Sequence, residues 1–107
     1  TCYDLPKING IQASFTDAIL VDDSFYFLAS AEDSQSTYLD GEVTGSSIGK
    51  INVTTMKLKK VITITNTHKF EGLTLYKNNA KSLEFLLCED QDNEVMVSQI
   101  FKLTLNK

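Results

Sequence analysis

The sequence predicts an all-β protein, in which antiparallel four-stranded, blade-like repeats form a partial β-propeller. Three observations support this fold class. Apolar residues alternate with polar ones, or run on for a few residues, in seven short segments. No window of the sequence shows the 3.6-residue periodicity of an amphipathic helix. The chain also contains an internal repeat, because residues 15–33 resemble residues 70–90, and such self-similarity is typical of stacked or radially arranged units.

Each expected strand is bounded by polar turn residues. Asp22-Asp23-Ser24 separates the first two strands and predicts a hairpin. Residues 58–65 are rich in β-branched side chains, which suit a strand with one exposed face. Residues 76–81 are polar and predict a turn. The expected strands are residues 13–21, 25–31, 47–53, 58–65, 71–76, 83–89 and 98–105.

The internal repeat divides a single all-β unit, residues 1–107, into two parts. We expect the first blade-like repeat at residues 11–66, with four strands, and a second, incomplete repeat at residues 67–107, with three. Four antiparallel strands are typical of a propeller blade, and propellers close with four or more blades. The expected partners are therefore the remainder of a longer propeller, or other copies of the chain joined through open strand edges. The alternative fold is a compact β-sandwich or barrel of about seven strands.

The composition disfavours several classes of partner. The chain has 14 acidic and 10 basic residues, which give a formal net charge of −4. This balance disfavours nucleic acid, because nucleic-acid binding usually requires a basic face. No segment approaches the roughly 20 apolar residues that span a bilayer, so we expect a soluble protein with no membrane insertion. We expect Cys88 to be a buried free thiol, because it follows Leu86 and Leu87.

Two acidic segments are candidate cation sites. Residues 31–42 and residues 89–94 each contain four carboxylates, and Ca²⁺ prefers several oxygen ligands from a short loop. The same composition is typical of solvated turns, in which Asp and Asn bond their own backbone. Calcium is the one cofactor that the composition suggests. The candidate metal ligands are Glu32, Asp33, Glu89, Asp90 and Asp92.

Three carboxylates are candidate ligand-binding residues. Glu71 begins an expected strand, and a carboxylate on the innermost strand of a blade would face the central channel of a propeller. Thr16 lies at the corresponding place in the first repeat and Asp17 follows it directly, and Asp40 belongs to the first acidic segment. His68, the only histidine, lies in a polar stretch and is expected at the surface. No residue is assigned a catalytic role, because no nucleophile motif such as Gly-x-Ser-x-Gly occurs.

Motifs spread over nearly the whole chain carry a family resemblance. They are Ala13-Ser14-Phe15-Thr16-Asp17-Ala18, Ala31-Glu32-Asp33, Tyr38-Leu39-Asp40-Gly41, Gly45-Ser46-Ser47-Ile48-Gly49, Lys69-Phe70-Glu71-Gly72-Leu73 and Cys88-Glu89-Asp90-Gln91-Asp92. In this order they resemble a bacterial family of unknown function (DUF6929) of the Bacteroidetes type. The resemblance implies a β-propeller distantly similar to the esterase-like phytase domains, and this chain looks like its C-terminal part. Similarity to phytase-like propellers implies calcium and a phosphorylated or ester substrate.

Two functions follow from these observations. The first is a non-catalytic propeller-type module, or a fragment of one, that binds a ligand or partner or acts as a scaffold. The alternative is a calcium-dependent hydrolase of phosphate or carboxylic esters, of the phytase-like type, completed by residues outside this chain. The sequence favours the non-catalytic module, because it shows neither a nucleophile with its base nor an arginine-rich phosphate clamp.

Overall fold

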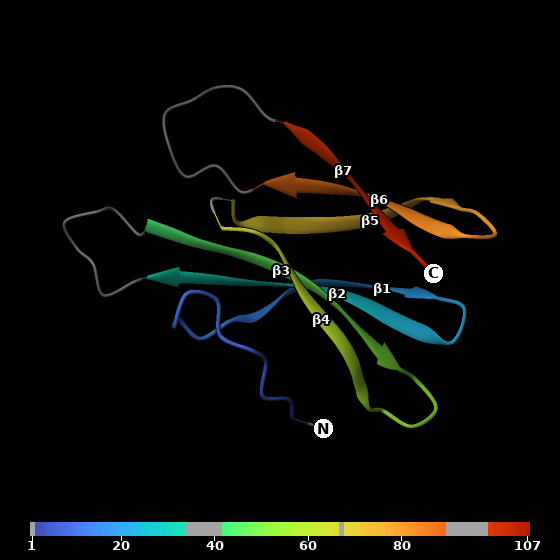
Figure 1. The fold of residues 1–107 in the computed structure, drawn as a ribbon, viewed down its shortest axis with the longest axis horizontal. Coiled ribbons are helices and arrows are strands. Elements are labelled where there is room, and N and C mark those ends of the chain that lie inside the picture. The colour runs from blue at the N-terminus through green and yellow to red at the C-terminus, as the bar shows by residue number, and fades with distance from the viewer. Residues whose placement is uncertain (1, 34–41, 67, 90–98) are drawn as a thin grey trace.

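The structure is a computed structural model that describes residues 2–33, 42–66, 68–89 and 99–107 (Figure 1). In these ranges it contains seven strands and no helix, so the all-β class is confirmed. None of the described segments forms a helix that is long and apolar enough to cross a membrane. The strands are β1 (Ser14–Val21), β2 (Ser24–Asp33), β3 (Glu42–Asn52), β4 (Leu58–Thr65), β5 (Phe70–Asn78), β6 (Ser82–Glu89) and β7 (Ile100–Asn106).

The strands form two antiparallel sheets, each of which follows the order of the chain. One sheet has the order β1-β2-β3-β4 and the other the order β5-β6-β7. The expected hairpin between the first two strands is confirmed, since Val21 pairs with Ser24 and Asp22 has a φ of 56°. Aspartate tolerates this left-handed conformation because its short side chain can bond locally. Two packed sheets fit the sandwich alternative, and the chain order within each sheet also fits propeller blades.

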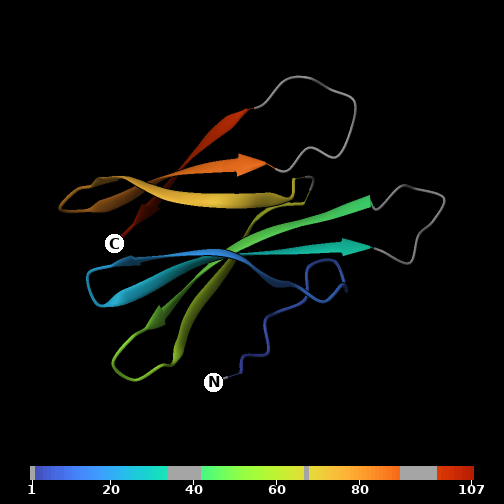
Figure 2. The same cartoon turned by 180° about the vertical axis from the view of Figure 1, so that it is seen from behind.

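A first apolar core lies between the two sheets. Strand β5 lies along β1 and β2, as Figures 1 and 2 show. Successive side chains of a strand point to opposite faces, so alternate residues of β6 and β7 enter this core. Its buried members are Val21, Leu28, Ile48, Phe70, Leu73, Leu83, Phe85 and Leu87.

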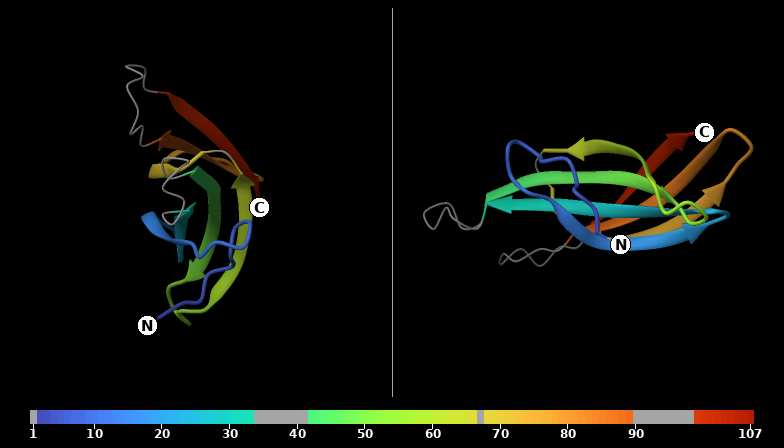
Figure 3. Two further views of the ribbon diagram at one scale, coloured as in Figure 1. Left: turned by 90° about the vertical axis from the view of Figure 1, so that its left-hand side faces the viewer. Right: turned by 90° about the horizontal axis from the view of Figure 1, so that it is seen from below.

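A second apolar core lies on the opposite face of the four-stranded sheet. Leu5, Ile8 and Ala13 of the N-terminal segment cover Phe27 there. Gly49 allows this packing, because a Cβ at this position would lie 2.2 Å from Cζ of Phe27. Parts of both faces of the four-stranded sheet are therefore packed against other segments of the chain. Figure 3 shows how strongly its strands twist, as is usual for antiparallel sheets.

Two expectations are corrected by the structure. Strand β3 begins at Glu42 rather than at residue 47, because Gly45 adopts a φ of +128° and the polar stretch around it pairs with β2. A Cβ at Gly45 would lie 2.2 Å from the Thr65 carbonyl oxygen. The thiol of Cys88 is free but exposed, so the expectation of burial is wrong. The reason is alternation, since Leu87 points into the core and its neighbour must point away.

Candidate functional site

One face of β2 and β3 changes character along its length, and this change sets up the candidate site. Three cross-strand pairs lie on the face that looks toward the three-stranded sheet, because every second residue of a strand shares a face. The pairs are Ser30 with Ser46, Leu28 with Ile48, and Tyr26 with Lys50. The face is therefore hydroxylic at one end, apolar in the middle, and aromatic and charged at the other end.

At the hydroxylic end, three side chains of the four-stranded sheet form hydrogen bonds to the backbone at the start of β5. The fully buried Ser46 Oγ accepts a hydrogen bond from the Phe70 amide at 2.9 Å and donates one to the His68 carbonyl at 2.8 Å. Ser30 Oγ lies 2.7 Å from Ser46 Oγ and donates to the Phe70 carbonyl at 3.2 Å. Thr16 Oγ1 donates to the same carbonyl at 2.9 Å. We call Thr16, Ser30 and Ser46 the hydroxyl network.

Asp17, a predicted ligand-binding residue, also links the two sheets. Its Oδ2 accepts a hydrogen bond from the Leu73 amide of β5 at 2.8 Å, and its Oδ1 accepts one from the Ala18 amide at 2.8 Å. The register of β1 shifts between Phe15 and Asp17, and such irregularities re-aim a side chain. The carboxylate of Asp17 is thus engaged by the backbone of two strands.

Glu71, the second predicted ligand-binding residue, forms an ion pair with the residue that directly precedes its strand. Its Oε1 lies 3.2 Å from Nζ of Lys69, and the Glu71 side chain is 36% exposed. The structure therefore joins Asp17 and Glu71 to different partners. Their role as ligand-binding residues stays a prediction.

Glu89, a predicted metal ligand, contacts the side chain of His68, the only histidine of the sequence. Its Oε2 contacts Nδ1 of His68, whose ring stacks on Phe70 at 5.8 Å and lies 5.1 Å from Phe101. His68 is thus a half-buried residue with fixed neighbours, which the polar sequence around it does not reveal. When a carboxylate accepts the Nδ1 proton of a neutral imidazole, Nε2 becomes the acceptor.

The other predicted carboxylates cannot be placed as side chains. Asp40, Asp90 and Asp92 lie outside the described residues, and Glu32 and Asp33 are described only as the end of β2. Among the side chains that are described, no three of the types His, Cys, Asp and Glu gather into a metal-binding group. Calcium binding therefore stays a prediction.

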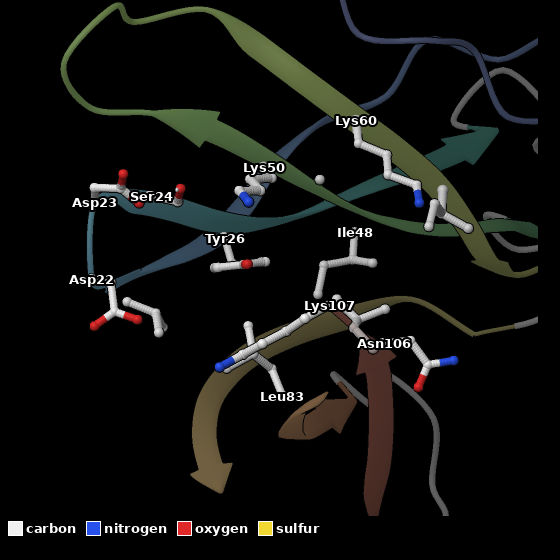
Figure 4. Close-up of a pocket in the computed structure, with 14 residues that line it drawn as sticks. Asp22, Asp23, Ser24, Tyr26, Ile48, Lys50, Lys60, Leu83, Asn106 and Lys107 are labelled. Atoms are coloured by element: carbon white, nitrogen blue, oxygen red, sulfur yellow. Dashed lines mark hydrogen bonds between the residues drawn. The ribbon is translucent and has the colours of Figure 1, made fainter. Parts of the chain in front are cut away.

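At the end of the interface opposite the hydroxyl network, the sheets separate and leave a cleft of about 460 Å³ (Figure 4). Apolar side chains from both sheets line it, among them Val21, Ile48, Leu83 and Leu105. Its charged lining residues are Asp22, Asp23, Lys50, Lys60 and Lys107. This combination of an apolar base and a few polar groups is typical of small-molecule sites.

Three cleft residues form a row across neighbouring strands, and we call Tyr26, Lys50 and Lys60 the lysine row. Lys50 pairs in register with Tyr26 of β2 on one side and with Lys60 of β4 on the other. The Lys50 ammonium group lies 5.8 Å from the centre of the Tyr26 ring. That ring lies 5.3 Å from the ring of Phe85, which belongs to the other sheet. The row therefore spans the cleft wall and touches the opposite sheet at one end.

The remaining charged residues lie at the rim of the cleft. Figure 4 shows Asp22 and Asp23 together at the turn between β1 and β2, toward one end of the cleft. Lys107 is tied to the turn between β5 and β6, because its Nζ donates to Asn78 Oδ1 at 2.7 Å and its amide to the Lys81 carbonyl at 2.8 Å. Lys50 and Lys60 are thus cleft-lining lysines that form no ion pair within the described part of the chain.

The lysine row was not predicted from the sequence. A signal was present, since Lys50 and Lys60 both lie in or next to an expected strand and Lys50 is two residues from the core residue Ile48. That the two lysines oppose each other depends on the register of β3 and β4, which shifts between Ser46 and Ser47 and again between Lys50 and Ile51. Such shifts are not encoded in a simple alternation of residue types.

Comparison with known proteins places the chain in a family. Residues 1–105 match a family of unknown function (DUF6929), so the chain belongs to that family. The search of curated proteins gives no match, and the search of solved structures gives none. The family expected from the motifs is therefore confirmed, and its description assigns no activity.

Proposed function

We propose that the chain is a non-catalytic binding module of the propeller type, and that a small molecule binds in the cleft between its two sheets. The observation that carries the proposal is the cleft itself, which has a volume of about 460 Å³ and is lined by apolar, aromatic and charged side chains. Small-molecule sites are typically concave and mostly apolar, with a few polar groups that orient the ligand.

Two features of the sheets support the propeller part of the proposal. Each sheet is an antiparallel meander in chain order, as a blade is. The first strands of the two sheets, β1 and β5, lie against each other, as expected for blades arranged around one axis. In this proposal the open edge of β7 pairs with a strand from the remainder of a longer propeller or from another copy of the chain.

The contacts of the described candidate carboxylates favour binding over ester hydrolysis. Asp17 accepts hydrogen bonds from the backbone, Glu71 pairs with Lys69, and Glu89 pairs with His68. A carboxylate that acts as general acid or base must lie within hydrogen-bond reach of the substrate. These three are engaged by groups of the protein and lie outside the lining of the cleft.

The proposal is tested by titrating the isotope-labelled protein with phenol, benzyl alcohol and phenyl phosphate while recording amide chemical shifts by NMR. We expect shifts that cluster at Tyr26, Gly49, Ile62 and Leu83, which line the cleft. Ile62→Trp replaces a branched alkyl side chain of the lining by the bulkier indole ring and should suppress the shifts. The matched control is Ile100→Trp, because Ile100 is 69% exposed on β7 and does not line the cleft.

Two results would contradict the proposal. Shifts that are absent, or that are scattered over the surface and unaffected by Ile62→Trp, would remove the cleft as the binding site. Release of nitrophenol from 4-nitrophenyl phosphate or 4-nitrophenyl acetate in the presence of Ca²⁺, lost in Glu71→Gln, would establish the hydrolase instead. Binding to the cleft without turnover supports the module.

A further inference from the structure

We infer that the cleft selects a small organic anion, whose phosphate or carboxylate group lies between the ammonium groups of Lys50 and Lys60 and whose apolar body lies against Tyr26. This inference rests on the proposed function, because it names the class of ligand that the same cleft takes. The experiment below separates its failure from the failure of the proposed function.

Two like charges form a pair in the lining of the cleft. Lys50 and Lys60 are directly opposite each other on β3 and β4, and both side chains line the cleft. Directly opposed residues of antiparallel strands have Cβ atoms only about 5 Å apart, and like charges in this arrangement are destabilising. An anion between the two ammonium groups would turn this repulsion into two charge-assisted hydrogen bonds.

The acidic residues nearby do not neutralise the pair of lysines. Among the described residues, no carboxylate lies within ion-pair distance of either Lys50 or Lys60. Asp22 and Asp23 are exposed in the turn at the end of the cleft, and Figure 4 shows Lys60 well away from both. The cation–π contact with Tyr26 holds Lys50 in place but leaves its positive charge unpaired.

The cleft also has room for an apolar part of the ligand. The cleft volume of about 460 Å³ is much larger than one inorganic ion needs. Next to the lysines it offers the Tyr26 ring, the exposed Ile62 of one sheet and the half-buried Leu105 of the other. Burial of a flat apolar group against these side chains would add a hydrophobic contribution to the binding of the charged group.

Phosphate and carboxylate ligands share one feature, since each presents an oxyanion with two or more acceptor atoms. Lysine binds phosphate as a point charge, so a dianion gains more from the pair than a monoanion. We therefore expect phenyl phosphate to bind more tightly than benzoate, and benzoate more tightly than the uncharged phenol.

The test is a set of calorimetric titrations with phenyl phosphate, benzoate, phenol and inorganic phosphate. For the wild-type protein we expect the dissociation constant of phenyl phosphate to be about tenfold or more below that of phenol, as charge-assisted hydrogen bonds predict. Lys50→Gln and Lys60→Gln should each reduce this advantage several-fold, and the double variant should abolish it. Lys59→Gln is the control, because it removes the same charge from an exposed neighbour that does not line the cleft.

Each outcome decides one part of the inference. If phenol binds the cleft and the anions bind no better, the anion site is wrong while the proposed function stands. If neither phenol nor phenyl phosphate perturbs the cleft, both fail. If inorganic phosphate binds as tightly as phenyl phosphate, the apolar body has no role and the organic part of the inference is overturned. If Lys59→Gln and Lys60→Gln lose the same amount of affinity for phenyl phosphate, net charge alone explains the preference for the anion. The assignment of the anion site to the lysine pair is then overturned.

Discussion

The two ends of the interface between the sheets use the same strands for opposite purposes. At one end Ser30 and Ser46 pair across β2 and β3 and bind the backbone at the start of β5. At the other end Tyr26 and Lys50 pair across the same two strands and line the cleft. Small hydroxyl side chains let the sheets approach and bond, whereas long side chains with charged ends require solvent or a ligand between them.

This difference shows how one regular register can produce both a hydrogen-bonded contact between the sheets and a cleft. We call the contact that the hydroxyl network and Asp17 make with β5 the joint. Between the two ends lies the apolar pair of Leu28 and Ile48, which is almost fully buried. The hydroxyl network keeps the sheets close on one side of this pair, and the cleft lies on the other side. Experiments on the two ends should therefore give different kinds of effect, with stability changing at the joint and ligand binding changing at the cleft.

The largest effect is expected for Ser46→Ala at the joint. The substitution leaves the Phe70 amide and the His68 carbonyl without the hydroxyl that binds them. An unsatisfied buried backbone group costs about 1–3 kcal/mol, so we expect a loss of about 3 kcal/mol in the free energy of unfolding. Urea denaturation followed by circular dichroism measures this change.

The adjacent residue is the control for Ser46→Ala. The Oγ of Ser47 is buried and, within the described part of the chain, has no hydrogen-bond partner. Ser47→Ala removes an unsatisfied hydroxyl and should leave stability unchanged or raise it by about 1 kcal/mol. Equal losses in the two variants would mean that packing of the serine side chains, and not the hydroxyl network, holds the sheets together.

A smaller effect is expected for Asp17→Ala, which tests the joint from the side of β1. Loss of the hydrogen bond to the Leu73 amide should cost about 1–2 kcal/mol, because the acceptor is charged and partly buried. Glu71→Gln is the comparison, since its ion pair with Lys69 is 36% exposed on the glutamate side and should contribute less than about 0.5 kcal/mol. If Asp17 were a ligand-binding residue rather than a structural one, Asp17→Ala would leave thermal stability unchanged.

Strand positions were predictable from the sequence, because each strand carries alternating or continuous apolar residues between polar turns. The exceptions are informative. Strand β3 extends back to Glu42 through Gly45, whose positive φ permits pairing where the residue pattern alone predicts a loop. Cys88 was predicted as buried from its apolar neighbours, although alternation along β6 places it outside.

The site was harder to predict than the strands because it depends on register and on contacts between distant residues. Asp17 is predicted as a ligand-binding residue because it is a carboxylate, but its partner in the structure is a backbone amide 56 residues away in sequence. Lys50 and Lys60 are not predicted as site residues, because isolated lysines in strands usually lie on a solvated face. Only the pairing of β3 with β4, together with the opposite sheet, brings these lysines to one side of a cleft.

The smallest effect concerns the stability of the free protein at the cleft. Lys60→Gln removes the repulsion between two directly opposed charges, so we expect a gain of about 0.3 kcal/mol in the free energy of unfolding at low salt. The gain should vanish in about 1 M salt, where the Debye length is about 3 Å. Lys59→Gln makes the same change in net charge and should show no gain, so the difference between the two variants isolates the lysine pair. A free protein that is destabilised by Lys60→Gln relative to Lys59→Gln would mean that Lys60 already has a favourable internal partner, and the cleft would then resemble the joint rather than differ from it.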